Sequence, residues 1–429
     1  MTSGTEAFAD PLTDPRAAAL EPAAPSPPAR RVGAAVGMVR SRLRNPVTWV
    51  WTIAIALVVP FAVHQLQVRV DPIIDLHVYR DAGLSLLHHE PLYSHYTVTR
   101  YSVLPFTYPP FAAALAMPMA LLPLTWVGAV WDVGVYLALY LVLRIVLVPV
   151  RDQVSAWQPW LEPYLMPLAW LSSAFLIVGQ QQVHYGQVGF FLMAMICVDL
   201  LTPATGRWRG VLVGLATAIK LTPGVFVVAL FLAGRRRAAG VAVATAAFVS
   251  GVVAVIAPAS SRAYWTGALF DSDRLGDNTD ATNQSLRGML LRTGLDHTLV
   301  TGLFLFLVLV VGGLGVRKAL TAWRAGDDLM AVTLVGLLMA LLSPVGWIHH
   351  FVFVVPLLAL LVRDHRWKTF VVLAGLWSFN WPILWSHQLT HEQLTWLGWG
   401  RTLFESTLGI SAALVVVLLP AVRRALPRP

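Results

Sequence analysis

Residues 210–237 read GVLVGLATAIKLTPGVFVVALFLAGRRR, and this stretch decides the fold class of the chain. A long apolar run ends there at three consecutive arginines. An α-helix needs about 20 apolar residues to cross the hydrocarbon core of a bilayer, and basic residues beside such a run mark its cytoplasmic end. Similar apolar runs recur along almost the whole chain. The pattern therefore predicts an integral membrane protein with many spans.

The composition agrees with this class. Hydrophobic residues make up 57% of the 429 residues and charged residues only 12%, whereas soluble domains carry about 25% charged residues. The mean hydropathy is +0.67. The formal net charge of +9 comes mainly from short basic clusters between apolar runs, which are topology signals. Because no basic stripe with interleaved aromatic residues occurs, we expect no nucleic-acid partner.

We predict an all-α, polytopic membrane bundle of about 12 transmembrane helices, within a domain at 46–422. Residues 1–45 and 423–429 are predicted to be cytoplasmic tails, the first of them disordered. Two long segments, 67–106 and 258–297, are expected outside the membrane. The approximate spans are 47–66, 107–122, 125–148, 163–180, 187–204, 210–233, 238–257, 298–316, 327–343, 347–362, 369–385 and 402–420.

Lys220 and Pro223 interrupt the 210–233 run. A broken or re-entrant helix is therefore an alternative to a continuous span, and it is allowed where it lines a polar cavity. Charges inside a membrane are costly and usually functional. Lys220 is expected to meet a phosphate ligand or a buried partner, unless its side chain extends to the membrane surface.

Asp75 follows the first predicted span, just before a possible amphipathic helix at 79–89. Its carboxylate can take a proton from an incoming hydroxyl, as a general base does. Alternatively, it only caps that helix. Both interpretations are open at this stage.

Other polar residues interrupt the apolar runs. His349 and His350 at the mouth of a span can donate hydrogen bonds to phosphate oxygens. Adjacent helical residues point about 100° apart, so both histidines are not expected to bind one ion. The single cysteine, Cys197, allows no thiolate metal site, and we predict neither a metal nor a cofactor. Gln180–Gln182 and Gln187 either line a polar cavity or join neighbouring helices.

Nucleotide-binding and nucleophile-elbow motifs of the P-loop, GxGxxG and GxSxG types do not occur in a usable context. If the chain is a transferase, its donor is therefore expected to be carried by a lipid.

The ordered motifs of the chain resemble those of glycosyltransferase family 87, the polyprenyl-phosphate-mannose-dependent mannosyltransferases of mycobacteria and relatives. The resemblance covers about residues 47–420. It rests on DLHVY (75–79), PLY (91–93), TYPPF (107–111), GQ (186–187), IKLTP (219–223), NQS (283–285) and SPVGWIHH (343–350).

This resemblance implies a GT-C fold in the plasma membrane, with the active site facing the periplasm and Asp75 as the catalytic base. It implies inverting transfer of mannose from polyprenyl-phosphate-mannose to a glycolipid or lipoglycan acceptor, with an α-(1→2) linkage expected. The partners would be this donor, the acceptor and membrane lipids. His350, His349 and Lys220, in that order, are expected to bind the donor phosphate. The expected substrate-cavity residues are His77, Tyr79, Tyr108, Gln187, Asn283 and Gln284.

Two alternatives remain. A transporter or lipid flippase would explain the many helices and the intramembrane polar groups. Transporters, however, usually place binding groups at the midplane between internal repeats, and we find no clear repeat. An arabinofuranosyl or glucosyl transferase of the same architecture is the second alternative, and the sequence does not separate it from a mannosyltransferase.

Overall fold

The structure is a computed structural model that describes residues 45–67, 73–99, 103–271, 274, 276–379 and 399–421. Both predicted tails, apart from residue 45, lie outside these ranges. The chain divides into two units, Met1–Thr52 and Ile53–Pro429. Of the first unit the structure describes residues 45–52, which include the beginning of α2, and the site described below lies in the second unit.

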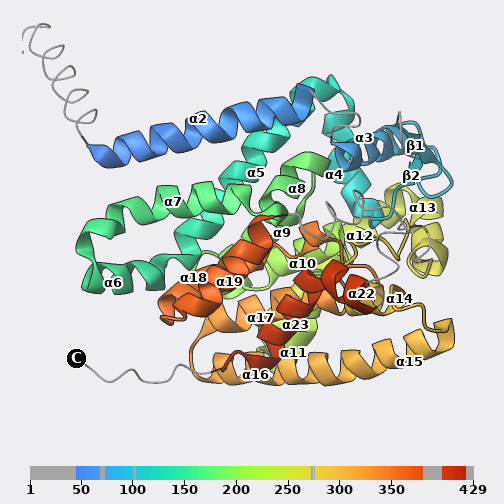
Figure 1. Cartoon of the computed structure of the whole chain (residues 1–429). Coiled ribbons are helices and arrows are strands. Elements are labelled where there is room, and N and C mark those ends of the chain that lie inside the picture. Colours follow the sequence, from blue (N-terminus) through green and yellow to red (C-terminus); the bar gives the residue numbers. More distant parts are fainter. Residues whose placement is uncertain are drawn as a thin grey trace, which may run out of the picture. The chain divides into compact units, whose positions relative to one another are not determined.

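Helices make up most of the described chain (Figure 1). In the first half these are α2 (Pro46–Gln67), α3 (Ile74–Leu87), α4 (Pro110–Ala120), α5 (Leu124–Val146), α6 (Val148–Trp157), η1 (Pro159–Leu161), α7 (Glu162–Phe175), α8 (Ile177–Tyr185), α9 (Gly189–Leu201), η2 (Gly206–Trp208), α10 (Val211–Ile219) and α11 (Gly224–Leu232).

The second half continues in the same style. Its helices are α12 (Arg236–Ile256), α13 (Pro258–Ala263), η3 (Tyr264–Ala268), α14 (Leu286–Leu291), α15 (His297–Leu307), η5 (Val308–Gly312), α16 (Gly313–Arg324), α17 (Asp328–Leu341), η6 (Ile348–His350), α18 (Val354–Arg363), α19 (Trp367–Ser378), α22 (Trp399–Glu405) and α23 (Thr407–Leu418).

Membrane-spanning length is reached by four helices of the described chain: α2, α5, α12 and the continuous segment His297–Arg324. The pair α7 and α8 adds a fifth if its 64° bend belongs to one span. The membrane helical class is thus confirmed, whereas a count of twelve spans is not. The predicted run 210–233 is a broken helix, because α10 ends before Lys220 and α11 begins after Pro223.

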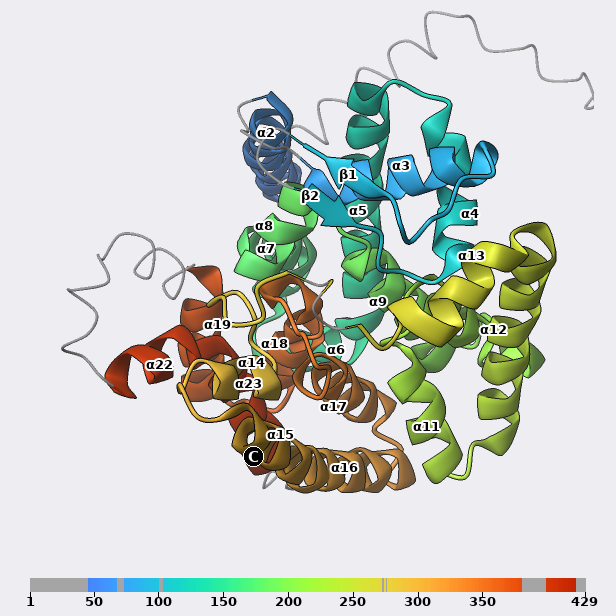
Figure 2. The same ribbon diagram turned by 90° about the vertical axis from the view of Figure 1, so that its right-hand side faces the viewer.

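The all-α prediction needs one correction. The first outer segment contains a short antiparallel hairpin, β1 (Tyr96–Val98) and β2 (Val103–Pro105), in which Thr97 pairs with Leu104. Figure 2 shows this hairpin beside α3. The alternation of exposed and buried residues in β1 is typical of a strand with one covered face, but three residues are too few to predict it.

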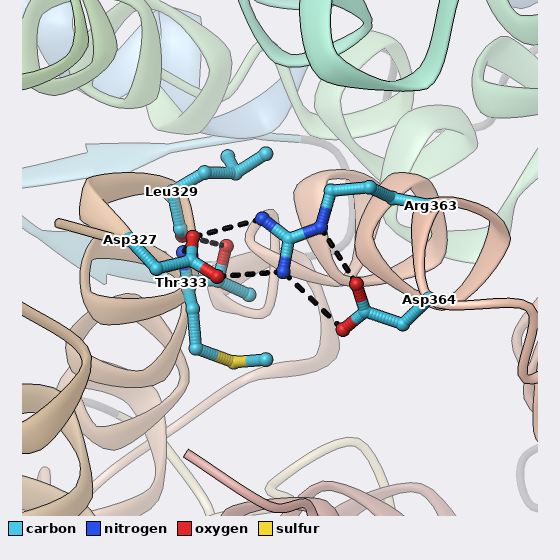
Figure 3. A network of polar contacts seen from close by, with 6 residues as sticks. Asp327, Leu329, Thr333, Arg363 and Asp364 are labelled. Carbon is cyan, nitrogen blue, oxygen red and sulfur yellow. Dashed lines mark hydrogen bonds and ion pairs between the residues drawn. The ribbon is translucent and has the colours of Figure 1, made fainter. Parts of the chain in front are cut away.

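A buried ion-pair network joins the beginning of α17 to the end of α18 (Figure 3). Arg363 donates to the two carboxylate oxygens of Asp327 at 2.8 and 2.7 Å and to those of Asp364 at 2.8 and 3.2 Å. Asp327 also caps α17 by accepting from the Met330 backbone N–H at 3.0 Å. The arginine side chain is only 2% exposed. Such a two-sided fork fixes the two helices relative to each other.

Candidate active site

A cavity of about 300 Å³ lies where α3, the segment before α4, the α8–α9 junction, the α10–α11 break and η6 meet. It brings together residues that are far apart in the chain. The lining residues include Asp75, Tyr79, Phe106, Tyr108, Gln181, Tyr185, Gln187, Lys220, Arg274, Thr282, Trp347, His349 and His350. A larger cavity of about 1010 Å³ is lined by parts of α5, α9, α17 and α18 and contains none of the predicted site residues.

Asp75 lies in the first turn of α3, and it does not cap the helix. The residue at the N-cap is Ile73, which has a left-handed backbone (φ 52°) and provides no side-chain cap. One oxygen of Asp75 instead accepts a hydrogen bond from the Gln187 side-chain amide at 2.6 Å. Among the described residues no donor reaches its other oxygen, so that oxygen is available to a substrate in the cavity.

Gly186 makes the contact between α3 and Gln187 possible. It ends α8 in the left-handed conformation, φ 71°, which glycine adopts without steric cost. A Cβ atom at this position would lie only 2.7 Å from the Cβ of Leu76. The backbone of the α8–α9 junction can therefore touch the first turn of α3, and Gln187 is placed directly against Asp75.

A chain of hydrogen bonds connects Asp75 to Lys220 through Gln187 and Tyr108. Gln187 Oε1 accepts from the hydroxyl of Tyr108 at 3.4 Å, and that hydroxyl accepts from the Lys220 ammonium at 2.8 Å. The Lys220 ammonium also lies 4.7 Å from the centre of the Tyr108 ring. Tyr79 joins the chain, with its hydroxyl 3.0 Å from that of Tyr108. A carboxylate and an ammonium group thus share one cavity without touching.

His350 and His349 follow Trp347 on the short turn η6, and their two rings are perpendicular. His350 Nε2 lies 2.9 Å from the Lys220 ammonium. Because a lysine ammonium only donates, His350 Nε2 accepts from it. Both ring nitrogens of His349 are buried and have no hydrogen-bond partner in the described part of the chain. His350 therefore holds Lys220 in place, while His349 still has unused hydrogen-bonding capacity beside the cavity.

Burial raises the pKa of Asp75 to about 6, although the Gln187 hydrogen bond and the positive charge of Lys220 both act to lower it. The carboxylate is thus ionised near neutral pH and still basic enough to take up a proton, as a general base requires. Burial also raises the pKa of Tyr79 well above its usual range. The charges of Tyr108 and Asp75 and the hydrogen bond with Tyr108 act in the same direction. Tyr79 therefore stays a neutral hydroxyl.

His77 does not line the cavity, although we predicted that it would. It lies two residues after Asp75 on α3, and residues at this spacing point about 200° apart around a helix. Tyr79, four residues after Asp75, lies on the same face as the carboxylate and does line the cavity. The helical periodicity thus separates the two residues of the DLHVY motif.

Asn283 and Gln284, also predicted for the cavity, are fully buried and are not among the residues that line it. Asn283 accepts from the Gly346 backbone N–H at 3.0 Å, and its neighbour Gln284 accepts from Gly409 at 2.7 Å. Buried amides are hydrogen-bonded in this way when they join loops. Their role is to position the segment before η6 and α23.

The glutamines of α8 divide between the two roles that their pattern allowed. Gln181 lines the cavity. Gln182, the next residue, donates to the backbone carbonyl of His349 at 2.8 Å and accepts from the Phe190 backbone N–H at 3.3 Å. It therefore joins η6 to α8 and α9 instead of facing a substrate.

Arg274, Tyr185 and Trp347 are among the lining residues that were not predicted from the sequence. Arg274 is one charge among many in the second outer segment, so no local pattern marks it. Trp347 lies inside the SPVGWIHH motif, and its position two residues before His349 was a usable signal. Within the described ranges, no group of three or more His, Cys, Asp or Glu residues could hold a metal ion.

Comparison with known proteins identifies the framework around this cavity. Residues 106–344 match glycosyltransferase family 87, which is more than half of the chain. The chain belongs to this family. It is therefore an enzyme of the hexosyltransferase class, and its apolar helices make it a membrane glycosyltransferase. No solved structure matches it.

Relatives from mycobacteria are similar over most of their length. A polyprenol-phosphate-mannose-dependent α-(1-2)-phosphatidylinositol pentamannoside mannosyltransferase of Mycolicibacterium smegmatis is 36% identical over 73% of this chain and 78% of its own. The protein of the same description from Mycobacterium tuberculosis is 32% identical, over 84% and 82%. An α-(1-2)-phosphatidylinositol mannoside mannosyltransferase of M. tuberculosis is 31% identical, over 88% and 92%.

Proposed function

We propose that this family 87 glycosyltransferase transfers mannose from polyprenyl-phosphate-mannose to a phosphatidylinositol mannoside at the outer face of the plasma membrane. The observation that carries the proposal is the pairing of Asp75 and Lys220 in one cavity of about 300 Å³. Sugar transfer from a lipid phosphate requires a base for the acceptor and a cation for the leaving phosphate. The descriptions of the relatives supply the donor and acceptor class.

The reaction is a single displacement with inversion. The free oxygen of Asp75 takes the proton of an acceptor mannose hydroxyl, and the hydroxyl oxygen forms a bond to the anomeric carbon of the donor. The bond from that carbon to the phosphate oxygen breaks, and the phosphate keeps the electron pair. A β-linked donor then gives an α-linked product, and the relatives' descriptions support an α-(1→2) linkage.

Lys220 is the main group proposed for the leaving phosphate, ahead of His350 and His349. Its ammonium is the positive charge linked to Asp75 by the hydrogen-bond chain, and His350 Nε2 is engaged in accepting from it. Placing a positive charge where negative charge develops is the largest single contribution in many enzymes. Phosphate leaves readily as an anion, so the scheme needs no general acid.

Tyr79, Tyr108 and Gln187 position the two charged groups. The two tyrosine hydroxyls and the Gln187 amide form the hydrogen-bond chain between the charges. This chain holds the Asp75 carboxylate toward the cavity without neutralising it by a direct ion pair. The aromatic rings leave an apolar wall on which one face of a sugar can pack.

The test is reconstitution of the purified protein in lipid nanodiscs with labelled polyprenyl-phosphate-mannose and a phosphatidylinositol mannoside acceptor. We expect one mannose to be added, and a linkage-specific α-(1→2) mannosidase should release it. Transfer from labelled lipid-phosphate glucose or arabinose in place of mannose would contradict the donor assignment. Movement of unmodified lipid across vesicles without any glycosidic product would favour the flippase alternative instead.

The outer-face placement has its own test. Ser94 and Ala325 are exposed and lie in segments predicted outside and inside, respectively. Each is replaced by cysteine in a Cys197→Ser background, because the native cysteine is buried. In intact cells a membrane-impermeant maleimide should label the Ser94→Cys protein and leave the Ala325→Cys protein unlabelled. The reverse pattern would place the cavity on the cytoplasmic side.

A further inference from the structure

Arg274 is a second cation in the wall of the cavity, and it has no acidic partner in the described part of the chain. One of its terminal nitrogens donates to the backbone carbonyl of Tyr93 at 2.7 Å, and its guanidinium lies 5.8 Å from the centre of the Tyr96 ring. Its Nε is buried without a hydrogen-bond partner. The guanidinium is therefore held in position while most of its donors remain unused.

The two cations of the cavity are held by different elements. Lys220 lies at the break between α10 and α11 and contacts Tyr108 and His350. Arg274 comes from the segment between α13 and α14 and contacts the residues that follow α3 and begin β1, Tyr93 and Tyr96. Arg274 thus belongs to the part of the cavity wall that the two long outer segments build. The site has two separately anchored positions for negative charge.

Two phosphate groups take part in the proposed reaction, one on the donor and one on the acceptor lipid. The donor phosphate leaves during the reaction, whereas the phosphodiester of a phosphatidylinositol-based acceptor stays intact. An arginine fork suits such a group, because the planar guanidinium pairs with two phosphate oxygens at once. Lysine offers only a point charge, which matches an anion whose charge develops as a bond breaks.

We infer that Arg274 binds the phosphodiester of the acceptor lipid and selects anionic glycolipids over neutral ones. This inference rests on the proposed function. It makes Arg274 a residue for acceptor specificity that takes no part in the chemical step. The hydrogen bond to the Tyr93 carbonyl and the contact with the Tyr96 ring orient the guanidinium, and its remaining terminal donors are the ones that would meet the phosphate oxygens.

The test compares two acceptors in nanodiscs, a phosphatidylinositol mannoside and an alkyl α-mannoside that lacks phosphate. For Arg274→Gln we expect the KM for the phosphorylated acceptor to rise about 10- to 100-fold, as loss of a charge-assisted pair implies. The kcat, the donor KM and all constants for the alkyl mannoside should stay within about threefold of wild type. Arg274→Lys should recover part of the KM effect, since it keeps the charge without the fork.

Arg262→Gln is the matched control, because Arg262 is an exposed arginine of the same outer segment outside the cavity. It should behave like wild type with both acceptors. An equal loss with both acceptors, or a raised donor KM, would overturn the inference, and so would an unchanged KM for the phosphorylated acceptor. If the wild-type protein transferred mannose to neither acceptor, the proposed function itself would fail.

Discussion

Two clusters of buried charge in this enzyme are built in opposite ways. In the cluster of Figure 3, Arg363 directs its donors at two carboxylates, and every contact is between 2.7 and 3.2 Å. In the cavity, Asp75 and Lys220 are bridged by neutral side chains and do not form an ion pair. One oxygen of Asp75 has no donor among the described residues. The first cluster is saturated, and the second is not.

This difference separates structural from chemical use of buried charge. A saturated pair has no affinity left for a ligand, and it fixes helices. An unsaturated pair is costly in the free protein, because buried polar groups without partners lose hydration. A protein retains such destabilising groups at a functional site, where a bound substrate supplies the missing contacts. Variants of the two clusters should therefore affect different measurements.

The largest effect is expected for Asp75→Asn. The amide keeps the shape but cannot take a proton, so kcat should fall about 10³-fold, within the range for loss of a general base. Burial raises the pKa of Asp75 from its normal value of 3.8 to about 6 in the folded protein. The folded protein is therefore most stable, relative to the unfolded chain, below pH 3.8, and it loses stability as the pH rises through about 6 and the buried carboxylate ionises. The melting temperature at pH 7.5 should thus not decrease.

Labelled-donor transfer and thermal unfolding of the same preparation check this prediction. Retained transfer within tenfold of wild type would remove Asp75 from the chemical step. A large loss of both activity and stability would instead place Asp75 with the structural cluster.

Arg363→Met should show the opposite profile. It removes the buried guanidinium from the carboxylates of Asp327 and Asp364, which are themselves 16% and 12% exposed, and breaking a buried pair costs about 3–5 kcal/mol. The free energy of unfolding in detergent should fall by this amount, while kcat per folded molecule stays within about twofold. Arg151→Gln is the control, because its pair with Glu162 is half exposed and is worth at most about 1 kcal/mol.

Gln187→Leu tests the bridge between the charges. It removes the hydrogen bond that lowers the pKa of Asp75, so that pKa should rise above about 6 and the acid limb of the rate profile should move to higher pH. At neutral pH we expect about a tenfold loss in kcat, since part of the base is then protonated and poorly oriented. An acid limb that stays at the wild-type pH would show that the amide does not act on Asp75.

The last prediction concerns the wild-type enzyme and needs no substitution. Asp75 must be ionised to accept a proton. In the wild-type enzyme this group should therefore leave kcat unchanged above about pH 7, and below pH 6 kcat should decrease by a factor that approaches ten for each pH unit. Initial rates between pH 4.5 and 8 in one buffer series, with the fold monitored by circular dichroism, measure this limb. A rate that is unchanged down to pH 5 would contradict the raised pKa.

The sequence predicted the membrane class, allowed a break at Lys220 as an alternative to a continuous span, and pointed to several residues, such as Asp75, Gln187 and Lys220, that lie together at the cavity. These predictions rested on the free-energy cost of placing an ionisable side chain in or beside an apolar segment. That cost depends only on the neighbouring residues in the sequence, so a lysine or aspartate in such a place is easily recognised. The outer segments were less predictable. Arg274 lies among several other charged residues, and only its contacts with Tyr93 and Tyr96 distinguish it.

Asn283 and Gln284 show why the remainder could not be predicted. A polar residue before a helix fits a substrate cavity and a loop junction equally well. What distinguishes the two possibilities is a pair of distant backbone contacts. Gly346 lies 63 residues after Asn283, Gly409 lies 125 residues after Gln284, and each donates its backbone N–H to that amide. The count of twelve spans stays a prediction. The described chain also contains shorter apolar helices of 10–17 residues and one helix pair bent by 64°, and a hydropathy pattern shows neither feature.

The cavity volume of about 300 Å³ lies at the lower end of the range of roughly 300–1,000 Å³ typical of ligand pockets. A space of this size is filled by the reacting sugar and phosphate groups, and it leaves no room for a polyprenyl chain or a diacylglycerol. Lipid tails must then remain in the bilayer, and differences in tail length should be poorly discriminated. Compact sugar phosphates without any lipid are accordingly a rational starting point for inhibitors of this enzyme.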